Sequence, residues 1–283
     1  MRLLSAALVL ACAAVVSVVA AQTAPPSAKV DTSVKAVLDK AERYIDDYQQ
    51  KLSYLLADEV YTQRVLDDTG DETAAQVTKA DFFITFVATR NEWMAVRDVR
   101  EVNGEPVENR GDLAALVAKP EAGPILAARN SRFNIGSIKR NFSEPTLALL
   151  LLDTRNRSRV KFDRVRIEPA GTMTLVVVKF KEQNEPTLIY RDDGRVRPQP
   201  VFSTGEMTID AETGKVMHTT ITFDGPIRAE MTTSYTQDAK LGLLLPSLLQ
   251  ERYERKDDGL TEVVTCTARY TNYRKFGVNV IIR

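Results

Sequence analysis

The sequence of 283 residues contains only one histidine and two cysteines. A single imidazole, His218, excludes the zinc-protease helix motif and every metal or catalytic site that needs two histidines. A serine or cysteine triad would have to use His218, which lies within a strand-like run and has no nucleophile-elbow sequence nearby. We therefore expect His218 to be an exposed residue without a catalytic role.

Other catalytic and metal-binding patterns are also weak. Ser158 and Lys161 have the Ser-x-x-Lys spacing of penicillin-recognising enzymes, but the alternation around them predicts a strand, and Ser-Asp-Asn and Lys-Thr-Gly do not occur. The acidic run at residues 67–72 lacks the spacing of a calcium loop and predicts a polar turn. The sequence thus predicts no catalytic residue, no metal site and no cofactor, and we expect a protein that is not an enzyme.

The first 21 residues have the pattern of a signal peptide. Arg2 precedes an apolar run without acidic residues, and small residues before Gln22 provide a cleavage site. This predicts an exported protein, periplasmic in the first place and secreted as an alternative. Cys12 follows Leu10-Ala11, which is close to a lipoprotein cleavage pattern, so a lipid anchor at Cys12 is a further alternative.

Cleavage after residue 21 would leave Cys266 as the only thiol, which excludes an intrachain disulfide. Cys266 shares one face of a strand-like run with Val264, Ala268 and Tyr270. We interpret it as a buried small hydrophobic residue, with a reactive or intermolecular thiol as the alternative.

Charge of one sign is not in excess, since 38 basic residues balance 38 acidic ones. Loss of Arg2 with the signal peptide leaves about −1, so nothing draws the whole chain toward nucleic acid, and we predict no nucleic-acid partner. A basic stripe on one face of a predicted extended segment could hold phosphate or anionic headgroups, or could pair with acids on a neighbouring strand, which we favour. The stripe consists of Arg155, Arg157, Arg159 and Lys161.

Residues 22–30 read as a disordered spacer, and the strongest periodicity of the chain follows. Apolar residues recur at steps of four and three and place one stripe along a long helix, with Asp31, Thr32 or Ser33 as the cap. The stripe consists of Val34, Leu38, Ala41, Ile45, Tyr48, Leu52 and Leu55. The change to strand patterning afterwards favours a helix laid across a sheet over a coiled coil.

Strands are predicted at residues 82–87 and 93–102, with Asn103-Gly104 turning the second into a hairpin. The middle of the chain predicts three helices, at residues 113–118, 124–133 and 145–152, the last capped by Ser143 and apolar all round. Residues 159–283 predict an antiparallel meander whose strands have one apolar and one polar face. The apolar face of this sheet is the candidate ligand site, formed by Met207, Ile209, Met217, Ile221, Phe223, Ile227 and Met231.

Several short motifs resemble the periplasmic lipoprotein-carrier (lipoprotein-sorting) superfamily and secreted bacterial proteins of that type. The amphipathic helix runs into Leu55–Gln63, with Tyr61-Thr62-Gln63 as the aromatic-x-Gln step, and the turn of residues 207–216 is similar to one common in the family. Leu245-Pro246 before a predicted strand and the closing segment 270–276 add to the likeness.

The resemblance implies an α+β fold, in which a curved antiparallel sheet forms an incomplete barrel covered on its concave side by helices. We expect a single domain over residues 31–283 with a helical insertion at about 111–152. The implied function is a non-catalytic periplasmic or secreted binding protein for an apolar ligand, a lipid or an acyl chain, with a lipid or acylated protein as partner. The alternative is an envelope interaction or sensor module with a filled core and an envelope protein partner. The sequence carries no signal for the oligomeric state.

Overall fold

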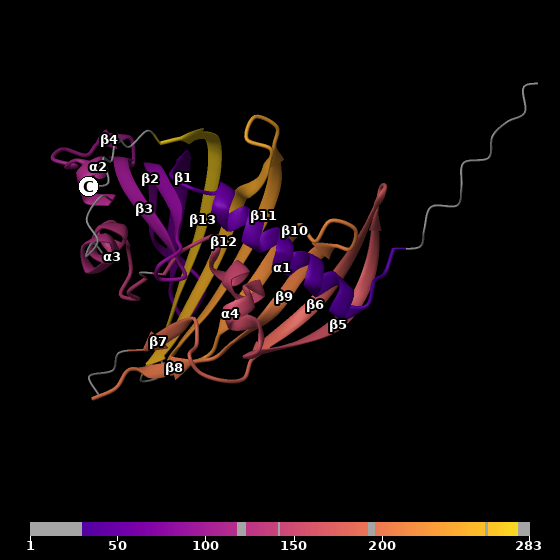
Figure 1. Ribbon diagram of the computed structural model, residues 1–283. Helices are drawn as coiled ribbons and strands as arrows, with labels where there is room; N and C mark the ends of the chain where they lie inside the picture. Colours follow the sequence, from indigo (N-terminus) through magenta and orange to yellow (C-terminus); the bar gives the residue numbers. More distant parts are fainter. Residues whose placement is uncertain (1–29, 118–122, 141, 192–195, 258–259, 277–283) are drawn as a thin grey trace, which may run out of the picture.

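The computed structural model describes residues 30–117, 123–140, 142–191, 196–257 and 260–276. The predicted signal peptide, Cys12 and most of the predicted spacer lie outside these residues. The described part forms an antiparallel 11-stranded sheet in the order β4-β3-β2-β1-β13-β12-β11-β10-β9-β6-β5, with a separate β7-β8 hairpin. The two outermost strands do not pair with each other, so the barrel is incomplete, as predicted (Figure 1).

The helices are α1 (Val34–Lys51), α2 (Leu113–Val117), α3 (Gly123–Ser131), the 3-10 helix η1 (Leu147–Leu152) and α4 (Thr154–Arg157). The strands are β1 (Leu55–Leu66), β2 (Glu72–Val87), β3 (Glu92–Val102), β4 (Glu105–Pro106), β5 (Val160–Ala170), β6 (Met173–Glu182), β7 (Ile189–Arg191), β8 (Gln199–Val201), β9 (Ser203–Asp210), β10 (Val216–Phe223), β11 (Ile227–Asp238), β12 (Leu243–Asp257) and β13 (Leu260–Lys275).

Helix α1 crosses the concave face of the sheet, as the periodicity predicted (Figure 1). Ser33 caps it, since its Oγ accepts a hydrogen bond from the Ala36 amide at 3.3 Å. The helix ends where Leu52 N donates to Tyr48 O, and Tyr54 takes a positive φ of 51° before β1. Its apolar stripe packs into the main core together with strand residues, so the coiled-coil alternative is not needed to explain the pattern.

The middle of the chain differs in detail from the prediction. The all-round apolar helix is a short 3-10 helix, η1, and all six of its residues are buried, as predicted. Its cap is Thr146, which makes no side-chain capping bond, so the prediction of Ser143 as the cap was wrong. Residues 154–157 are helical, because Asp153 accepts a hydrogen bond from the Arg155 amide and starts a turn. The predicted extended basic stripe is therefore broken between α4 and β5.

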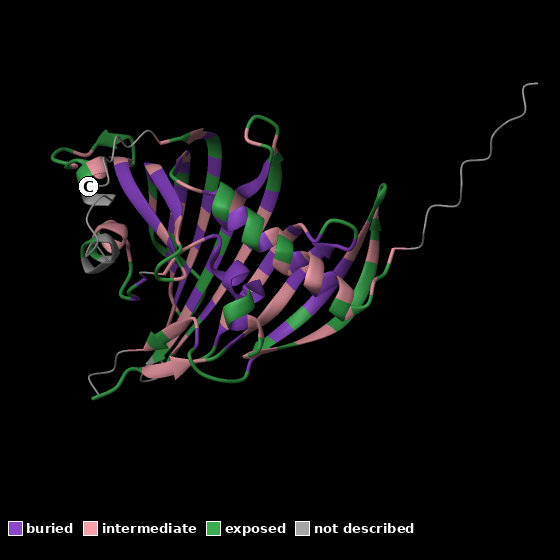
Figure 2. Ribbon diagram, viewed as in Figure 1, coloured by how far each residue is buried: buried purple, intermediate pink, exposed green. Residues whose placement is uncertain are grey.

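The sheet joins the beginning and the end of the chain, because β1 pairs with β13 along nearly its whole length. Asn103 and Gly104 have φ values of 52° and 90° and form the predicted hairpin turn between β3 and β4. Leu245-Pro246 lies inside β12 and not before it, next to a register shift that accommodates the missing proline N–H. Figure 2 shows buried and exposed positions alternating along the strands, as expected for a sheet with one covered face.

The two edges of the sheet differ. At β3, the side-chain amide of Asn130 in α3 accepts from Arg97 N and donates to Ala95 O, both at 2.8 Å, much as another strand would. At the opposite edge, no strand in the described ranges pairs with the outer side of β5. One edge is thus covered by a helix and the other is open.

Candidate functional site

The predicted ligand residues do gather on one face. Antiparallel register places Ile221 opposite Met231 and Val216 opposite Ile209, beneath α1. Five of the seven are 0–3% exposed, namely Met207, Ile209, Ile221, Phe223 and Met231. Met217 and Ile227 are partly buried against the same core. The sequence therefore identified one continuous apolar wall.

The protein's own side chains cover this wall. The buried residues of η1 and the stripe of α1 belong to the same core cluster as the wall. Met207 and Ile209 are 0% exposed, which leaves no space the size of a water molecule beside them. The leucines of η1 thus lie on the side of the sheet where the carrier resemblance implied room for acyl chains.

Helix α1 is fastened to the sheet and to the segment that contains η1. Gly214, in the β9–β10 turn, has a φ of 75° and lies so close to α1 that a Cβ would come within 2.6 Å of Ala41 N. Lys40 Nζ donates to Ala211 O in that turn at 2.6 Å. Gln49 Nε2 donates to Asp153 Oδ2 at 3.0 Å, which fixes the end of α1 to the residue that follows η1.

The other half of the concave face carries a buried ion pair. Glu59 on β1 accepts two hydrogen bonds from Arg97 on β3, from Nη2 at 2.8 Å and from Nε at 2.5 Å. The side chains are 0% and 5% exposed, and the guanidinium carbon lies 4.3 Å from the centre of the Tyr61 ring. Such a pair is strongly coupled, because each charge is buried and depends on the other.

Next to this pair, Glu251 is 3% exposed and accepts hydrogen bonds from Tyr61 Oη at 2.9 Å and Tyr253 Oη at 2.7 Å. Burial and the Glu251 charge raise the pKa of Tyr61 well above its ordinary value, so this phenol stays protonated. Arg140 is 1% exposed and donates to the Ile135 and Ile138 carbonyls. The interior is polar here, and these groups hydrogen-bond to one another, although Arg140 Nε has no hydrogen-bond partner in the described residues.

The sequence analysis did not identify this polar half. Glu59 and Gln63 occupy the inward positions of β1 that Leu55, Ala57 and Tyr61 also occupy. A charged residue on an otherwise apolar strand face is the signal that could have indicated a buried pair. Its partner Arg97 follows only from the pairing of β2 with β1 and β3.

A pocket of about 380 Å³ opens between β3 and α3. Two of its arginines converge on Asp98: Arg110 Nη2 lies 2.5 Å from Oδ2, and Arg129 Nη2 contacts Oδ1. Arg132 lies over the Phe133 ring at 4.9 Å and has no carboxylate within ion-pair distance in the described part of the chain. The remaining lining is Arg97, Val99, Val107, Ile125 and Ala128. Arg97 is held by Glu59, and Arg110 and Arg129 are held by Asp98. Among the described residues of this lining, Arg132 is therefore the cation left to pair with an anionic ligand group.

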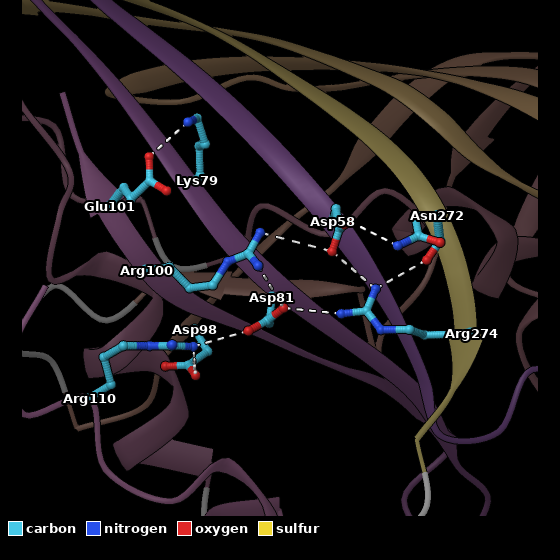
Figure 3. Close-up of polar contacts among 9 residues, drawn as sticks. All are labelled: Asp58, Lys79, Asp81, Asp98, Arg100, Glu101, Arg110, Asn272 and Arg274. Atoms are coloured by element: carbon cyan, nitrogen blue, oxygen red, sulfur yellow. Dashed lines mark hydrogen bonds and ion pairs between the residues drawn. The ribbon is translucent and has the colours of Figure 1, made fainter. Parts of the chain in front are cut away.

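The outer face of β13, β1, β2 and β3 carries a network of ion pairs (Figure 3). Arg274 binds Asp58 at 3.0 Å and Asp81 at 3.1 Å, Arg110 also reaches Asp81 at 3.0 Å, and Arg100 lies 3.6 Å from Asp81. Each arginine in this view faces a carboxylate. The network therefore links neighbouring strands and offers no unpaired anion site.

Cys266 and His218 are the two remaining side chains that the sequence analysis singled out. Cys266 is 2% exposed, and burial raises the pKa of its thiol to about 12. His218 was predicted to be exposed, but it is partly buried. Its Nδ1 lies 3.2 Å from Ser234 Oγ on β11, and burial lowers the pKa of the imidazole. Among the described residues, no group of three or more histidine, cysteine or acidic side chains could hold a metal ion.

The fold and the two faces define a class: an open α+β half barrel whose concave side is covered by its own helices. No protein-family model and no curated protein matches the chain. Among solved structures, it is similar to a LolA superfamily protein from Nitrosomonas europaea, at 11% identity and a TM-score of 0.28, covering 87% of this chain and 95% of that one.

Two further likenesses have the same character. A DUF1329 family protein from Desulfovibrio piger aligns at 9% identity and a TM-score of 0.35, over 87% of this chain and 94% of that one. The Pseudomonas aeruginosa MucA/MucB complex structure aligns at 10% identity and a TM-score of 0.20, over 85% and 99%. These likenesses assign no ligand or partner to this chain. The helices among the described residues fall short of the length and apolar character that a membrane span requires.

Proposed function

We propose that this chain is an exported, non-catalytic binding module that meets its partner at its surface and encloses no ligand in its resting fold. The supporting observation is the closure of the apolar wall: Met207 and Ile209 are 0% exposed and belong to one core cluster with α1 and the six buried residues of η1. A binding protein that holds an acyl chain needs a cavity with room for it. A filled core instead favours docking.

The arginine-lined pocket is the docking point that this proposal favours. Arg132 has its positive charge unpaired in the described residues, and Val99 and Val107 supply apolar contact beside it. The matching partner is an acidic segment of an envelope protein, of which one carboxylate would pair with the Arg132 guanidinium while an apolar side chain enters the pocket.

An acidic ten-residue glutamate peptide serves as the probe for this docking point. We expect weak, salt-sensitive binding by calorimetry at low ionic strength, and loss of that binding in Arg132→Glu. Arg43→Glu is the matched control, because Arg43 is exposed on α1, away from the pocket lining, and makes the same change in net charge. Equal weakening in both variants, or no binding at all, would reject the pocket as an acidic docking site.

The acyl-chain function predicted for the apolar wall is a second proposal, and it requires η1 to leave the wall. The flank of η1 gives this some support, because the hydroxyl oxygens of Ser143 and Thr146 are buried without a hydrogen-bond partner in the described residues. Native mass spectrometry of protein purified from its own compartment separates the two functions. The docking module should carry no lipid, whereas a stoichiometric acyl chain would establish the carrier.

A further inference from the structure

Strand β5 forms the open edge of the sheet, as Figure 1 shows at the side opposite α3. Its middle exposes two apolar side chains, Val165 at 43% and Ile167 at 45%. An open edge presents unpaired backbone N–H and C=O groups to any other strand. The side chains of β5 determine which strand can pair with this edge.

The order of side chains along β5 is complementary to itself. The segment reads Lys161-Phe162-Asp163-Arg164-Val165-Arg166-Ile167-Glu168. In an antiparallel pair of two β5 strands with the twofold axis between Arg164 and Val165, Lys161 lies opposite Glu168 of the second copy, and Asp163 lies opposite Arg166. Phe162 then lies opposite Ile167, so the apolar position also matches.

The bulge in β5 makes these matches face the same way. The register with β6 shifts between Arg164 and Arg166, so Val165 has no partner there. Before the shift, Lys161 and Asp163 lie opposite the exposed Lys181 and Lys179. Without the shift, residues 166 and 168 would point to the concave side, because side chains alternate along a strand.

After the shift, Arg166 and Glu168 lie opposite Val177 and Leu175, the alternate positions of β6 that share the outer face with Lys179. Ile167 lies opposite the core residue Val176, on the concave side where Phe162 faces Phe180. In a pair of two β5 strands, the two residues opposite each other would therefore lie on the same face of the sheet.

The charges of β5 make only exposed ion pairs within the chain. Lys161 lies 3.4 Å from Asp163, and Arg166 lies 2.5 Å from Glu168 and 3.4 Å from Glu206 on β9; all five side chains are 44–59% exposed. Exposed ion pairs of this kind contribute little to the free energy of folding. These side chains can therefore form new ion pairs with a second copy at little cost in stability. Charged residues and a bulge discourage pairing of an edge strand with unrelated strands. The charge order of β5 is complementary to itself in an antiparallel pair, so a second copy of β5 can still pair with it.

We propose that two copies of this chain associate through β5, and that the two 11-stranded sheets become one continuous antiparallel sheet. In the dimer the two sheets meet edge to edge at β5. Each arginine-lined pocket lies beside β3, at the opposite edge of its sheet, and stays accessible. The proposal is independent of what those pockets bind.

Sedimentation equilibrium of the full mature chain tests the dimer, with charge reversal and rescue. We expect reversible dimers, and at least about tenfold weaker association in Lys161→Glu and in Glu168→Lys, since each change puts like charges opposite each other at two symmetric places. The double variant Lys161→Glu with Glu168→Lys restores opposite charges and should restore dimerisation. Lys240→Glu, on an exposed turn, is the control for net charge.

A wild-type chain that stays monomeric at about 200 µM overturns the proposal. The proposal also fails if the dimer dissociation constant is unchanged in Lys161→Glu and in Glu168→Lys. A double variant that remains monomeric while circular dichroism and melting match the wild type overturns the register. Because all substitutions lie on an exposed edge or turn, the variants should fold, and their melting temperatures establish that they do.

Discussion

Gly214 and Ala41 lie in contact across 173 residues of sequence, with the turn of a hairpin pressed against the backbone of a helix. A Cβ on Gly214 would come within 2.6 Å of Ala41 N, and its φ of 75° is one that other residues rarely adopt. The contact holds α1 against the sheet near its middle. The closed concave face therefore depends on a glycine in a turn as well as on apolar packing.

Gly214→Ala should destabilise the fold by roughly 2–4 kcal/mol, because it combines backbone strain with a clash against α1. Gly171→Ala is the control, since Gly171 also has a positive φ, of 62°, but no atom lies within 4 Å of its Cβ position. It should cost about 1 kcal/mol from strain alone. Urea unfolding of both variants measures the difference, and equal losses would remove the contact from the explanation.

Arg97→Met should cost about 3–5 kcal/mol, because it leaves the Glu59 carboxylate buried without its partner. Both side chains are almost fully covered, at 5% and 0% exposure. The double variant Glu59→Met with Arg97→Met removes the buried charge and should recover most of the loss. Thermal unfolding of the wild type, Arg97→Met, Glu59→Met and the double variant gives the coupling energy. A double variant no more stable than Arg97→Met would contradict the assignment.

Much of the fold could be predicted from local patterns. The stripe from Leu38 to Leu52 placed α1 on the sheet because burial of one helix face is decided by sequence spacing alone. Asn103-Gly104 fixed one hairpin because few residues tolerate positive φ. Apolar alternation at Met207 and Ile209 assigned one strand face to the core.

The state of the candidate site could not be predicted in this way. Alternation predicts that Met207 faces inward, but it does not predict whether a ligand or the protein's own core residues cover it, since both bury the same surface. Likewise, Glu59 and Arg97 come together only because β1 pairs with β2 and β2 pairs with β3, and sequence spacing does not predict the register of these pairings. The α4 turn was missed because Asp153 as a helix cap overrides the strand-like alternation of the residues that follow.

Leu149→Ala should destabilise the protein by about 2–5 kcal/mol, because Leu149 is 2% exposed and its truncation leaves a cavity in the core. The same variant should gain affinity for a small apolar probe such as benzene, which the wild type should not bind. Benzene titration monitored by melting temperature compares the two proteins. Equal stabilisation of both by benzene would mean that the wild-type wall already has room, and would favour the carrier function.

Glu144 gives the structure a pH dependence of unusual sign. Burial, and then the neighbouring charge of Glu92, raise the pKa of Glu144 to about 8 from an ordinary value of 4.5. Between these values the folded chain keeps a proton that the unfolded chain has released. This group therefore lowers stability as the pH rises from about 4.5 to 8, and its contribution is constant above that range.

Glu144→Gln removes this loss. The variant should match the wild type near pH 4 and exceed it by roughly 2–4 kcal/mol at pH 9, since each shifted pKa unit corresponds to about 1.4 kcal/mol. Urea unfolding at half-unit pH steps measures the two curves. Glu92→Gln is the companion variant: it takes away one of the two causes, so its curve should lie between those of Glu144→Gln and the wild type above pH 8. Parallel curves for Glu144→Gln and wild type across pH 4–9 would show that Glu144 titrates as an ordinary exposed carboxyl.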